Sequence, residues 1–314
     1  MKNKKIVVTG GAGFIGSNIV HSIYKDNEVT VIDDISTGNF ENIVDLVEEK
    51  SINFVKGSIT DLRILQECFS DVDYVLHQAA IPSVPRSVKN PIATNKANIG
   101  GTLNVLVAAR DSNVEKVVFA SSSSVYGDTP TLPKIENMCP SPLSPYAISK
   151  LCGENYCKVF YEIYGLRTTS LRYFNVYGPR QNPKSEYAAV IPRFISSIMK
   201  GSPIDIYGDG DQTRDFTFVE DVVNANLLSC ESKKSDGKTL NIAGGKRISV
   251  NDLSQKIAKM LGIEVEIIYR ERREGDVKDS LADISLARAL IDYTPKYSLD
   301  NGLKKTVEFF NKKD

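Results

Sequence analysis

Tyr146 and Lys150 are two side chains that could move a proton together. They stand four residues apart in the stretch YAISK, so on a helix they share one face. A free tyrosine has a pKa of about 10 and is a poor base at neutral pH, but a nearby ammonium stabilises its phenolate. Hydroxyls of the preceding stretch SSSSVYG, residues 121–127, could share the proton and orient a substrate alcohol. By itself the Tyr-x-x-x-Lys pattern also fits an ordinary surface helix.

A glycine-rich turn near the start of the chain has the spacing of a dinucleotide-binding loop. The stretch GGAGFIG, Gly10–Gly16, lies between the apolar run KIVV and a helical pattern. Glycines there let the backbone turn tightly and approach a pyrophosphate at the helix N-terminus. The run EVTVID ends at Asp33, where an acidic residue accepts hydrogen bonds from the adenosine ribose and repels a 2′-phosphate. The sequence therefore predicts NAD rather than NADP, and Asp34 could share this role.

The elements that must position these residues alternate in the first half of the chain. Helical periodicity begins at Phe14, Asp61, Ile92 and Pro145, each time between apolar runs. This alternation predicts an α/β fold, a Rossmann-like doubly wound parallel sheet with helices on both faces. The expected strands are KKIVVTG, EVTVID, INFVKG, YVLHQAA, KVVFASS and LRTTSLRYFNVYG, and KTLNIAG is expected to rejoin the sheet.

The regular alternation of strand and helix patterns ends after about Asn175, where proline and glycine become frequent. Helical patterns return at 190–200, 219–231, 249–261 and 300–312. We predict an NAD-binding domain of residues 1–174, rejoined by about 216–243. Residues 175–215 and 244–314 are expected to form a smaller, interleaved α/β lobe that binds the substrate.

Composition narrows the range of partners. Lys plus Arg and Asp plus Glu both number 39, so the net charge of zero favours neither nucleic acid nor a membrane surface. No apolar run approaches eighteen residues and no signal-peptide pattern opens the chain, so we expect a cytoplasmic protein. Five cysteines without a C-x-x-C pair, and two histidines, favour reduced thiols and no metal site.

Five motifs occur together and in order: TGGAGFIG, SSSSVYG, YAISK, LRYFNVYGP and RREGD. From about Lys4 to Leu303 the sequence resembles the extended short-chain dehydrogenase/reductase family, and within it the nucleotide-sugar enzymes. The resemblance implies that Tyr146 is the catalytic base, Lys150 its partner and Ser122 the catalytic hydroxyl. The NAD contacts it implies are Gly10, Gly13, Phe14, Ile15, Gly16, Asp33, Asp34, Ser36, Thr37, Gly38, Ser58, Ile59, Gln78, Ala79, Ala80, Asn98, Ser121, Tyr146, Lys150 and Tyr173.

The residues that follow the catalytic serine separate reactions within this family. Members that are 4,6-dehydratases carry an Asp-Glu pair there, because eliminating water needs a general acid and a general base. This chain has Ser123 and Ser124, and it also lacks the glutamate usual in the UDP-glucuronate decarboxylases. The resemblance therefore implies NAD-dependent 4-epimerisation of a UDP-sugar through a transient 4-keto intermediate. It also implies a homodimer that pairs through helices beginning near Ile92 and Pro145.

Most of the implied substrate contacts lie in the second half of the chain. Ser280 falls where the family has a residue that limits the sugar pocket, a bulky tyrosine in glucose-restricted members. A small serine there implies that UDP-GlcNAc and UDP-GalNAc are accepted alongside UDP-Glc and UDP-Gal. The implied substrate contacts are Ser83, Ser122, Ser123, Ser124, Tyr146, Asn175, Val190, Ile206, Tyr207, Arg214, Arg273, Asp276 and Ser280.

Other functions remain open at this point. A UDP-glucuronate 4-epimerase would need a carboxylate site, for which Arg86 is the nearest candidate. Weaker alternatives are another NAD-dependent nucleotide-sugar enzyme, a decarboxylase or dehydratase, and an NAD-binding regulator without catalysis. Arg180 and Arg193 are expected to be solvated surface charges.

Overall fold

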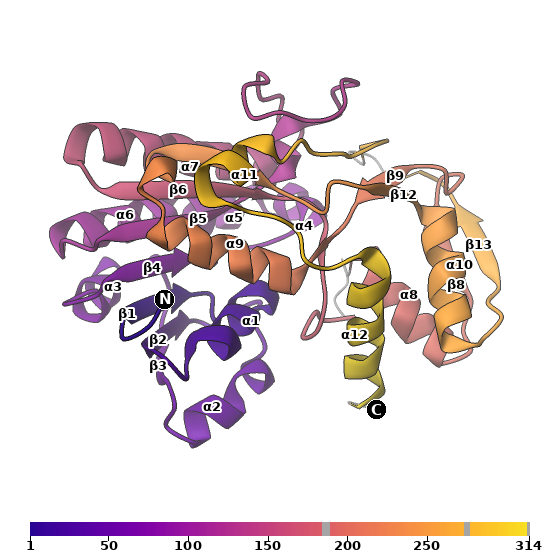
Figure 1. The fold of residues 1–314 in the computed structure, drawn as a ribbon, viewed down its shortest axis with the longest axis horizontal. Coiled ribbons are helices and arrows are strands. Elements are labelled where there is room, and N and C mark those ends of the chain that lie inside the picture. Colours follow the sequence, from indigo (N-terminus) through magenta and orange to yellow (C-terminus); the bar gives the residue numbers. More distant parts are fainter. Residues whose placement is uncertain (184–188, 273–276, 313–314) are drawn as a thin grey trace.

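A seven-stranded parallel sheet forms the centre of the molecule. The computed structural model describes residues 1–183, 189–272 and 277–312. The strand order is β11-β6-β5-β4-β1-β2-β3, and every neighbouring pair is parallel (Figure 1). This confirms the predicted fold class, including the return of KTLNIAG to the sheet as β11. The strands are β1 (Lys5–Thr9), β2 (Glu28–Asp33), β3 (Asn53–Lys56), β4 (Tyr74–His77), β5 (Lys116–Ser122), β6 (Arg167–Tyr173) and β11 (Lys238–Ile242).

Helices cover both faces of the sheet because alternate strand residues point to opposite sides. On β1, Ile6 and Val8 pack with the helices of one face, whereas Val7 packs with those of the other. The first face holds α1 (Phe14–Ile23), α9 (Val219–Glu231) and α11 (Ser285–Ile291). The second face holds α3 (Leu62–Cys68), α6 (Gly101–Asp111) and α7 (Pro145–Tyr164).

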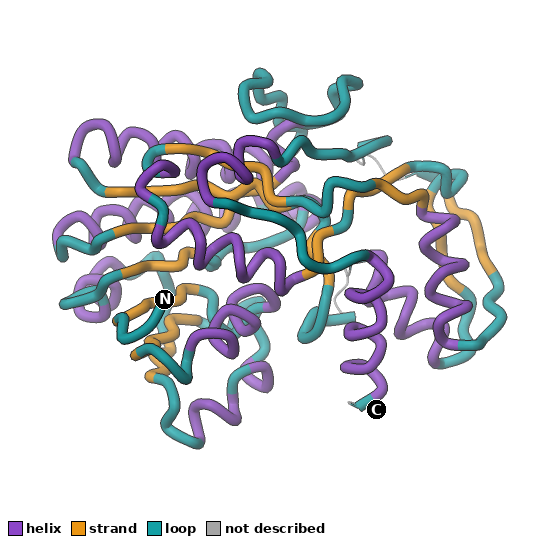
Figure 2. Tube along the Cα trace, viewed as in Figure 1, coloured by secondary structure: helices purple, strands orange, loops and turns teal. Residues whose placement is uncertain are grey.

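A smaller lobe lies beside the carboxyl end of the sheet (Figure 2). Its core is formed mainly by apolar residues of α8 (Val190–Met199), α10 (Val250–Leu261) and α12 (Leu299–Asn311). Three two-stranded ladders complete it: β7 (Val176–Tyr177) with β10 (Thr217–Phe218), β8 (Ile204–Tyr207) with β13 (Ile267–Arg270), and β9 (Thr213–Asp215) with β12 (Arg247–Ser249).

Two details differ from the sequence-based expectation. Residues 244–314 were assigned as a whole to the smaller lobe, yet Ala287 and Ile291 of α11 are buried in the core of the large sheet. The helix predicted from Ile92 begins as α5 (Pro91–Thr94), and a π-helical segment, Asn95–Gly100, joins it to α6. Three short helices were not predicted, α2 (Val44–Glu48), α4 (Val84–Lys89) and α11.

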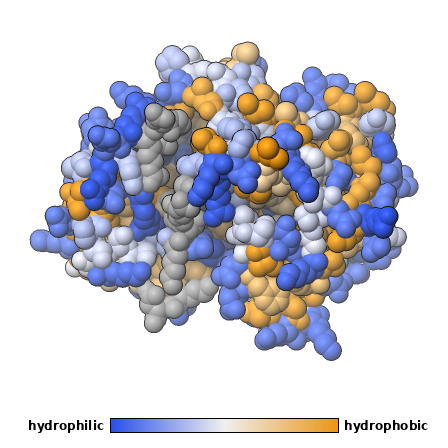
Figure 3. All heavy atoms as spheres, turned by 180° about the vertical axis from the view of Figure 1, so that it is seen from behind, coloured by the Kyte–Doolittle hydropathy of each residue, from blue (hydrophilic) through white to orange (hydrophobic). Residues whose placement is uncertain are grey.

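The face that Figure 3 shows, seen from behind, is mostly hydrophilic, with apolar residues between the polar ones. Within the described ranges, no helix is both long enough and apolar enough to cross a membrane.

Candidate active site

The first of three cavities opens where the glycine turn meets the carboxyl ends of the central strands. It has a volume of about 480 Å³. Gly10 has φ = +72°, and a Cβ on it would lie 2.6 Å from the Ala79 nitrogen. A Cβ on Gly16 would lie 2.1 Å from the Gly10 carbonyl oxygen. Only glycine fits these two positions, so the backbone is exposed to whatever occupies the cavity.

Helix α1 points its N-terminus at this cavity. The helix begins at Phe14, and no side chain of the described residues caps it. Its first N–H groups are therefore available to an anionic group such as a pyrophosphate. The residues present fit the diphosphate of a dinucleotide.

Asp33, at the end of β2, also lines the first cavity. Its two carboxylate oxygens accept hydrogen bonds from the backbone N–H groups of Ala12, at 3.0 Å, and Ile35, at 2.8 Å. A carboxylate has about four acceptor positions, so two remain for a ligand such as a ribose. The side chain is buried, and this burial raises the pKa of Asp33 above its usual value despite the two hydrogen bonds.

Nineteen of the twenty predicted cofactor residues line this first cavity. The exception is Asn98, which is buried behind its wall. The Asn98 side chain accepts from the Ile81 N–H at 2.7 Å and donates to the Ile81 carbonyl at 3.1 Å and to Ser149 at 3.1 Å. Ile81 does line the cavity, so Asn98 supports the wall rather than forming it.

The catalytic candidates meet between the first and second cavities. Helix α7 starts with Ser144 as its N-cap, whose hydroxyl accepts from the Ala147 N–H at 3.1 Å, and with Pro145 in its first turn. This start places Tyr146 one residue into the helix, where its side chain lines both cavities. The Tyr146 hydroxyl lies near enough to the Ser122 side chain for that side chain to lower the pKa of Tyr146. The structure thus brings the predicted base and the predicted catalytic hydroxyl together.

Lys150 stands one turn further along α7. Its Nζ donates to the Ala120 carbonyl at 2.7 Å and lies 5.8 Å from the centre of the Tyr146 ring. Burial lowers the pKa of Lys150 to about 8. Burial also raises the pKa of Tyr146, while the nearby Ser122 side chain lowers it. The ammonium near the ring favours the phenolate, so it opposes the effect of burial.

The second cavity, of about 460 Å³, extends from Tyr146 towards the smaller lobe. Ser122, Ser123 and Ser124 form one wall. The Ser124 hydroxyl is buried and has no hydrogen-bond partner in the described part of the chain, so it is available to a ligand. Ser280 also lines this cavity, and its hydroxyl accepts from Asn175 Nδ2 at 3.0 Å and from the Asp215 N–H at 3.2 Å.

The third cavity, of about 430 Å³, continues into the smaller lobe. Asn175 and Arg214 line both the second and the third cavity, and Ser83 lines all three. The predicted contacts Val190, Ile206 and Tyr207 line the third. Arg273 and Asp276 lie outside the described residues. The remaining substrate candidates therefore form one continuous path that begins at Tyr146.

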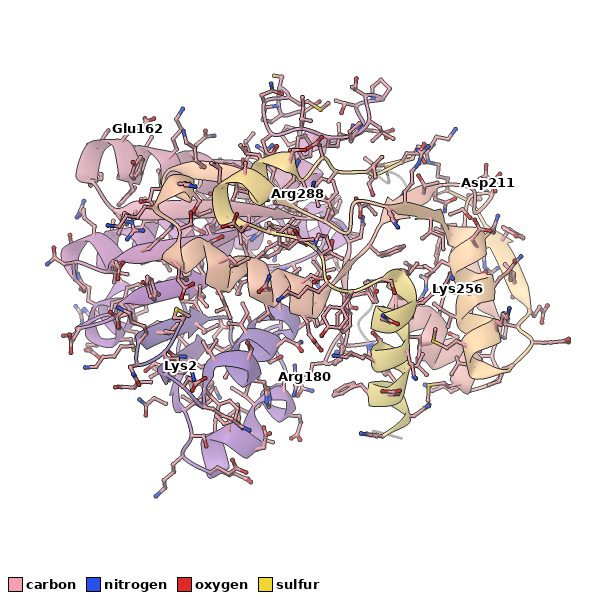
Figure 4. All side chains as sticks on the ribbon, viewed as in Figure 1. Lys2, Glu162, Arg180, Asp211, Lys256 and Arg288 are labelled. Carbon is pink, nitrogen blue, oxygen red and sulfur yellow. The ribbon has the colours of Figure 1, made fainter. Side chains whose placement is uncertain are left out.

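Sequence reasoning left Arg180 and Arg193 as solvated charges, but both line these cavities. Arg193 forms part of the third cavity, and one of its guanidinium nitrogens donates to the Asp205 carbonyl at 2.9 Å. Arg180 lines the first cavity between α1 and α12, bonded to Asn18 at 3.2 Å and 5.8 Å from the Phe309 ring centre (Figure 4). The sequence offers no signal for either position. Arg180 is covered where α1 and α12 meet, and Arg193 is covered by its contacts with β8.

The sequence profile of the NAD dependent epimerase/dehydratase family matches residues 6–243, which is more than half of the chain. The chain belongs to this family. The match begins in β1 and ends just after β11, so it covers the whole central sheet and the three catalytic candidates. NAD is therefore the cofactor to which the first cavity is fitted.

Three solved structures resemble the chain over nearly its full length. The UDP-N-acetylglucosamine 4-epimerase from Methanobrevibacter ruminantium, in complex with UDP-N-acetylmuramic acid, is 43% identical, with a TM-score of 0.96 and 100% of both chains covered. The UDP-glucose 4-epimerase from Thermotoga maritima, with UDP-glucose, is 39% identical, with a TM-score of 0.93 and coverage of 98% of this chain and 99% of that one. The UDP-glucuronic acid 4-epimerase from Bacillus cereus, with UDP-glucuronic acid and NAD, is 34% identical, with a TM-score of 0.92 and coverage of 99% and 100%.

All three are 4-epimerases of UDP-sugars, and they differ in the sugar. At these identities the chain falls within the NAD-dependent UDP-sugar 4-epimerases of the family.

Proposed function

We propose that this protein interconverts the C4 epimers of UDP-N-acetylhexosamines and UDP-hexoses. The observation that carries the proposal is the second cavity, which joins the Tyr146–Ser122 pair to a wall made by a small residue, Ser280. A wall residue of this size leaves volume beside the sugar for an N-acetyl group. The likeness to the Methanobrevibacter ruminantium enzyme supports the same class of substrate.

The residues of the first cavity would hold NAD, with the pyrophosphate at the start of α1 and the adenosine ribose at Asp33. NAD, when bound, would supply the acceptor for a hydride from C4 of the sugar and, once reduced, the donor for its return. The protein's own part is to remove and later restore the proton of the C4 hydroxyl. Tyr146 is the proton acceptor, and Ser122, which lies near it, orients the sugar hydroxyl.

Lys150 makes Tyr146 a usable base. With a pKa of about 8, Lys150 is mostly protonated at neutral pH and so places a positive charge near the phenol ring. Its bond to the Ala120 carbonyl fixes the ammonium to the same strand that ends at Ser122. The three groups are therefore held by one strand and one helix, which keeps their relative geometry fixed while the sugar moves.

The nucleotide would be held away from the chemistry, in the third cavity. Arg214 lies at the junction of the second and third cavities, where its forked guanidinium suits a diphosphate. Ile206 and Tyr207 would then pack beside the uracil. On this basis we assign NAD to residues 1–174 with about 216–243, and the nucleotide-sugar mainly to residues 175–215 and 244–314.

A second candidate is a UDP-glucuronate 4-epimerase, and one observation favours it. Arg86 lines the first cavity and not the second, so it does not face the sugar. Lys134, however, lines the second cavity, is 3% exposed, and donates to the backbone carbonyl of Thr129. Burial lowers the pKa of Lys134, and an anionic sugar carboxylate would restore a counter-charge.

We further propose that the protein forms a homodimer through α7 and α5. The outer side of α7 exposes Ile148, Val159 and Ile163, which are spaced to form one stripe, and α5 beside it exposes Ile92 at 82%. A helical stripe of this kind on two adjacent helices suits packing against its own copy. Ile163→Lys should then convert the dimer to a monomer in light scattering, whereas a wild-type monomer would contradict the proposal.

The function is tested by incubating the purified protein with UDP-GlcNAc, UDP-Glc and UDP-GlcA separately, without added cofactor, and separating the C4 epimers by chromatography. We expect UDP-GlcNAc and UDP-Glc to be converted to their epimers. Conversion of UDP-GlcA alone would favour the second candidate, and no conversion of any of the three would refute 4-epimerisation.

A further inference from the structure

The last three residues of β5 each interact with a different side chain of α7. These three α7 side chains are four residues apart, so they share the helix face that packs on β5 and β6. Two hydrogen bonds join Lys150 Nζ to the Ala120 carbonyl and the Ser121 hydroxyl to Glu154, and the Ser122 side chain lies near the Tyr146 hydroxyl.

Of these three interactions, only the bond between Ser121 and Glu154 is unexplained by the proposed chemistry. The Glu154 carboxylate also pairs with Arg172 of β6 through two parallel bonds, Nε to Oε1 at 2.9 Å and Nη2 to Oε2 at 2.7 Å. Both side chains are 5% exposed. Arg172 is the register partner of Ser121 across β5 and β6. One carboxylate therefore joins two strands and the catalytic helix at a single level of the sheet.

The next residue pair along β5 and β6 contains the catalytic candidate Ser122. Ser122 pairs with Tyr173, one residue beyond the Ser121–Arg172 pair, and both line the second cavity. A shift of β5 along α7 would change the distance between Ser122 and Tyr146 directly.

Other charged or titratable groups surround the ion pair. Arg172 lies 4.6 Å from the centre of the Tyr126 ring and donates to the Glu136 backbone carbonyl at 3.5 Å. Lys150 and Cys157 flank Glu154 on α7. Among the described residues, Arg172 is the ion-pair partner of Glu154. Removing either charge therefore leaves the other one buried without a counter-charge.

We propose that Glu154 and Arg172 form a positioning unit for catalysis, which holds the end of β5 against α7 through Ser121 so that Ser122 and Tyr146 meet in reactive geometry. Neither Glu154 nor Arg172 lines the three cavities, so they would act through Ser121 rather than on the sugar. The inference rests on the proposed 4-epimerase function. An error of about 1 Å in the position of a reacting group can cost about a hundredfold in rate.

The chain contains a matched control at the opposite end of the same two strands. Lys116 is the first residue of β5, and Arg167 is the first residue of β6. The Asp236 carboxylate forms ion pairs with Lys116 Nζ and Arg167 Nε, each at 2.7 Å. Lys116 also donates to the Ser235 hydroxyl at 3.0 Å. This second cluster joins the same strands but lies about a strand length from the site, and it is less buried, since Asp236 is 10% and Arg167 19% exposed.

The experiment compares Glu154→Gln with Asp236→Asn, and Ser121→Ala with Ser235→Ala. For each variant we measure kcat and KM with UDP-GlcNAc, bound NAD per chain, and stability in urea. Glu154→Gln is expected to lower kcat by about ten- to a hundredfold with little change in KM or bound NAD. Asp236→Asn is expected to lower the stability in urea about as much as Glu154→Gln does, while its kcat stays at the wild-type level.

Ser121→Ala keeps the Glu154–Arg172 ion pair, so it still tests the positioning role if Glu154→Gln does not fold. We expect it to lower kcat severalfold without loss of stability, whereas Ser235→Ala leaves kcat unchanged. Wild-type kcat in Ser121→Ala, or equal kcat in Glu154→Gln and Asp236→Asn, would overturn the inference. A wild-type protein that epimerises no UDP-sugar would instead refute the proposed function, which is a separate result.

Discussion

Replacing Gly16 with alanine should show how closely the turn before α1 is fitted to its cofactor. The added Cβ would lie 2.1 Å from the Gly10 carbonyl oxygen and 2.8 Å from its carbonyl carbon. Ordinary van der Waals contact begins at 3.4 Å, so the gap must open by 3.4 − 2.1 = 1.3 Å. Both neighbours are backbone atoms, so no side chain can rotate away to relieve the contact.

This displacement moves the start of α1 relative to the glycine turn. Hydrogen bonds to a charged group contribute about 1.5–3 kcal/mol, and losing one of them on the pyrophosphate would weaken NAD binding roughly 10- to 150-fold. The same overpacking should lower the free energy of unfolding by about 1–3 kcal/mol, because Ile19 and Val20 of α1 are fully buried against the sheet.

The measurement is bound NAD per chain after gel filtration, followed by calorimetric titration of NAD into the protein. Gly100→Ala is the matched control, since a Cβ there meets nothing within 4 Å and the residue is already helical, with φ of −61°. It should bind NAD normally and be stabilised by about 0.5–1 kcal/mol. Wild-type NAD affinity in Gly16→Ala would refute this account of the turn.

Three further substitutions test the catalytic groups and the sugar pocket. Tyr146→Phe should abolish turnover while NAD stays bound, and full activity would exclude Tyr146 as the base. Lys150→Met should move the acidic limb of the pH–rate profile upwards, because the phenolate loses its neighbouring cation. Since burial lowers the pKa of Lys150 from 10.5 to about 8, the wild-type free energy of unfolding should gain roughly 3 kcal/mol between these two pH values. In urea titrations of Lys150→Met, the contribution of Lys150 to this gain in the free energy of unfolding should be absent. Ser280→Tyr should lower kcat/KM for UDP-GlcNAc about ten- to a hundredfold more than for UDP-Glc, and equal losses would contradict its role as the limiting residue.

The sheet and the cofactor turn could be predicted because their signals are local. Short, apolar, β-branched runs separated by helical periodicity specify parallel strands buried on both faces. The spacing from the glycine turn to Asp33 specifies one strand–helix–strand unit, and β1, α1 and β2 form it as expected. Even β11 was recognisable, since KTLNIAG is short and apolar in the way that a central strand is.

Residues whose environment depends on distant segments could not be predicted. Arg180 and Arg193 look like surface charges in the sequence, yet both line cavities. Arg180 does so where α1 meets α12, and Arg193 does so where α8 packs on β8. Helix α4 was missed because Pro85 and Asn90 suggest a loop, although Asn90 ends α4 and caps α5. For Asn98, the resemblance placed a side chain near the cofactor without showing that it supports Ile81.

The sugar pocket combines two walls that are held in independent ways. The wall with Ser122 is fixed by the sheet and α7, as the bonds from β5 to that helix show. The wall with Ser280 is held by Asp215, whose N–H donates to the Ser280 hydroxyl at 3.2 Å and whose carboxylate accepts from the N–H groups of Gly245 and Ala282, each at 3.1 Å. Among the described residues no hydrogen bond joins Ser280 to Ser122, Ser123 or Ser124, so a change at Ser280 can alter which sugar fits without disturbing the proton transfer at Tyr146. Effects of Ser280→Tyr and Glu154→Gln on kcat/KM should therefore multiply in the double variant.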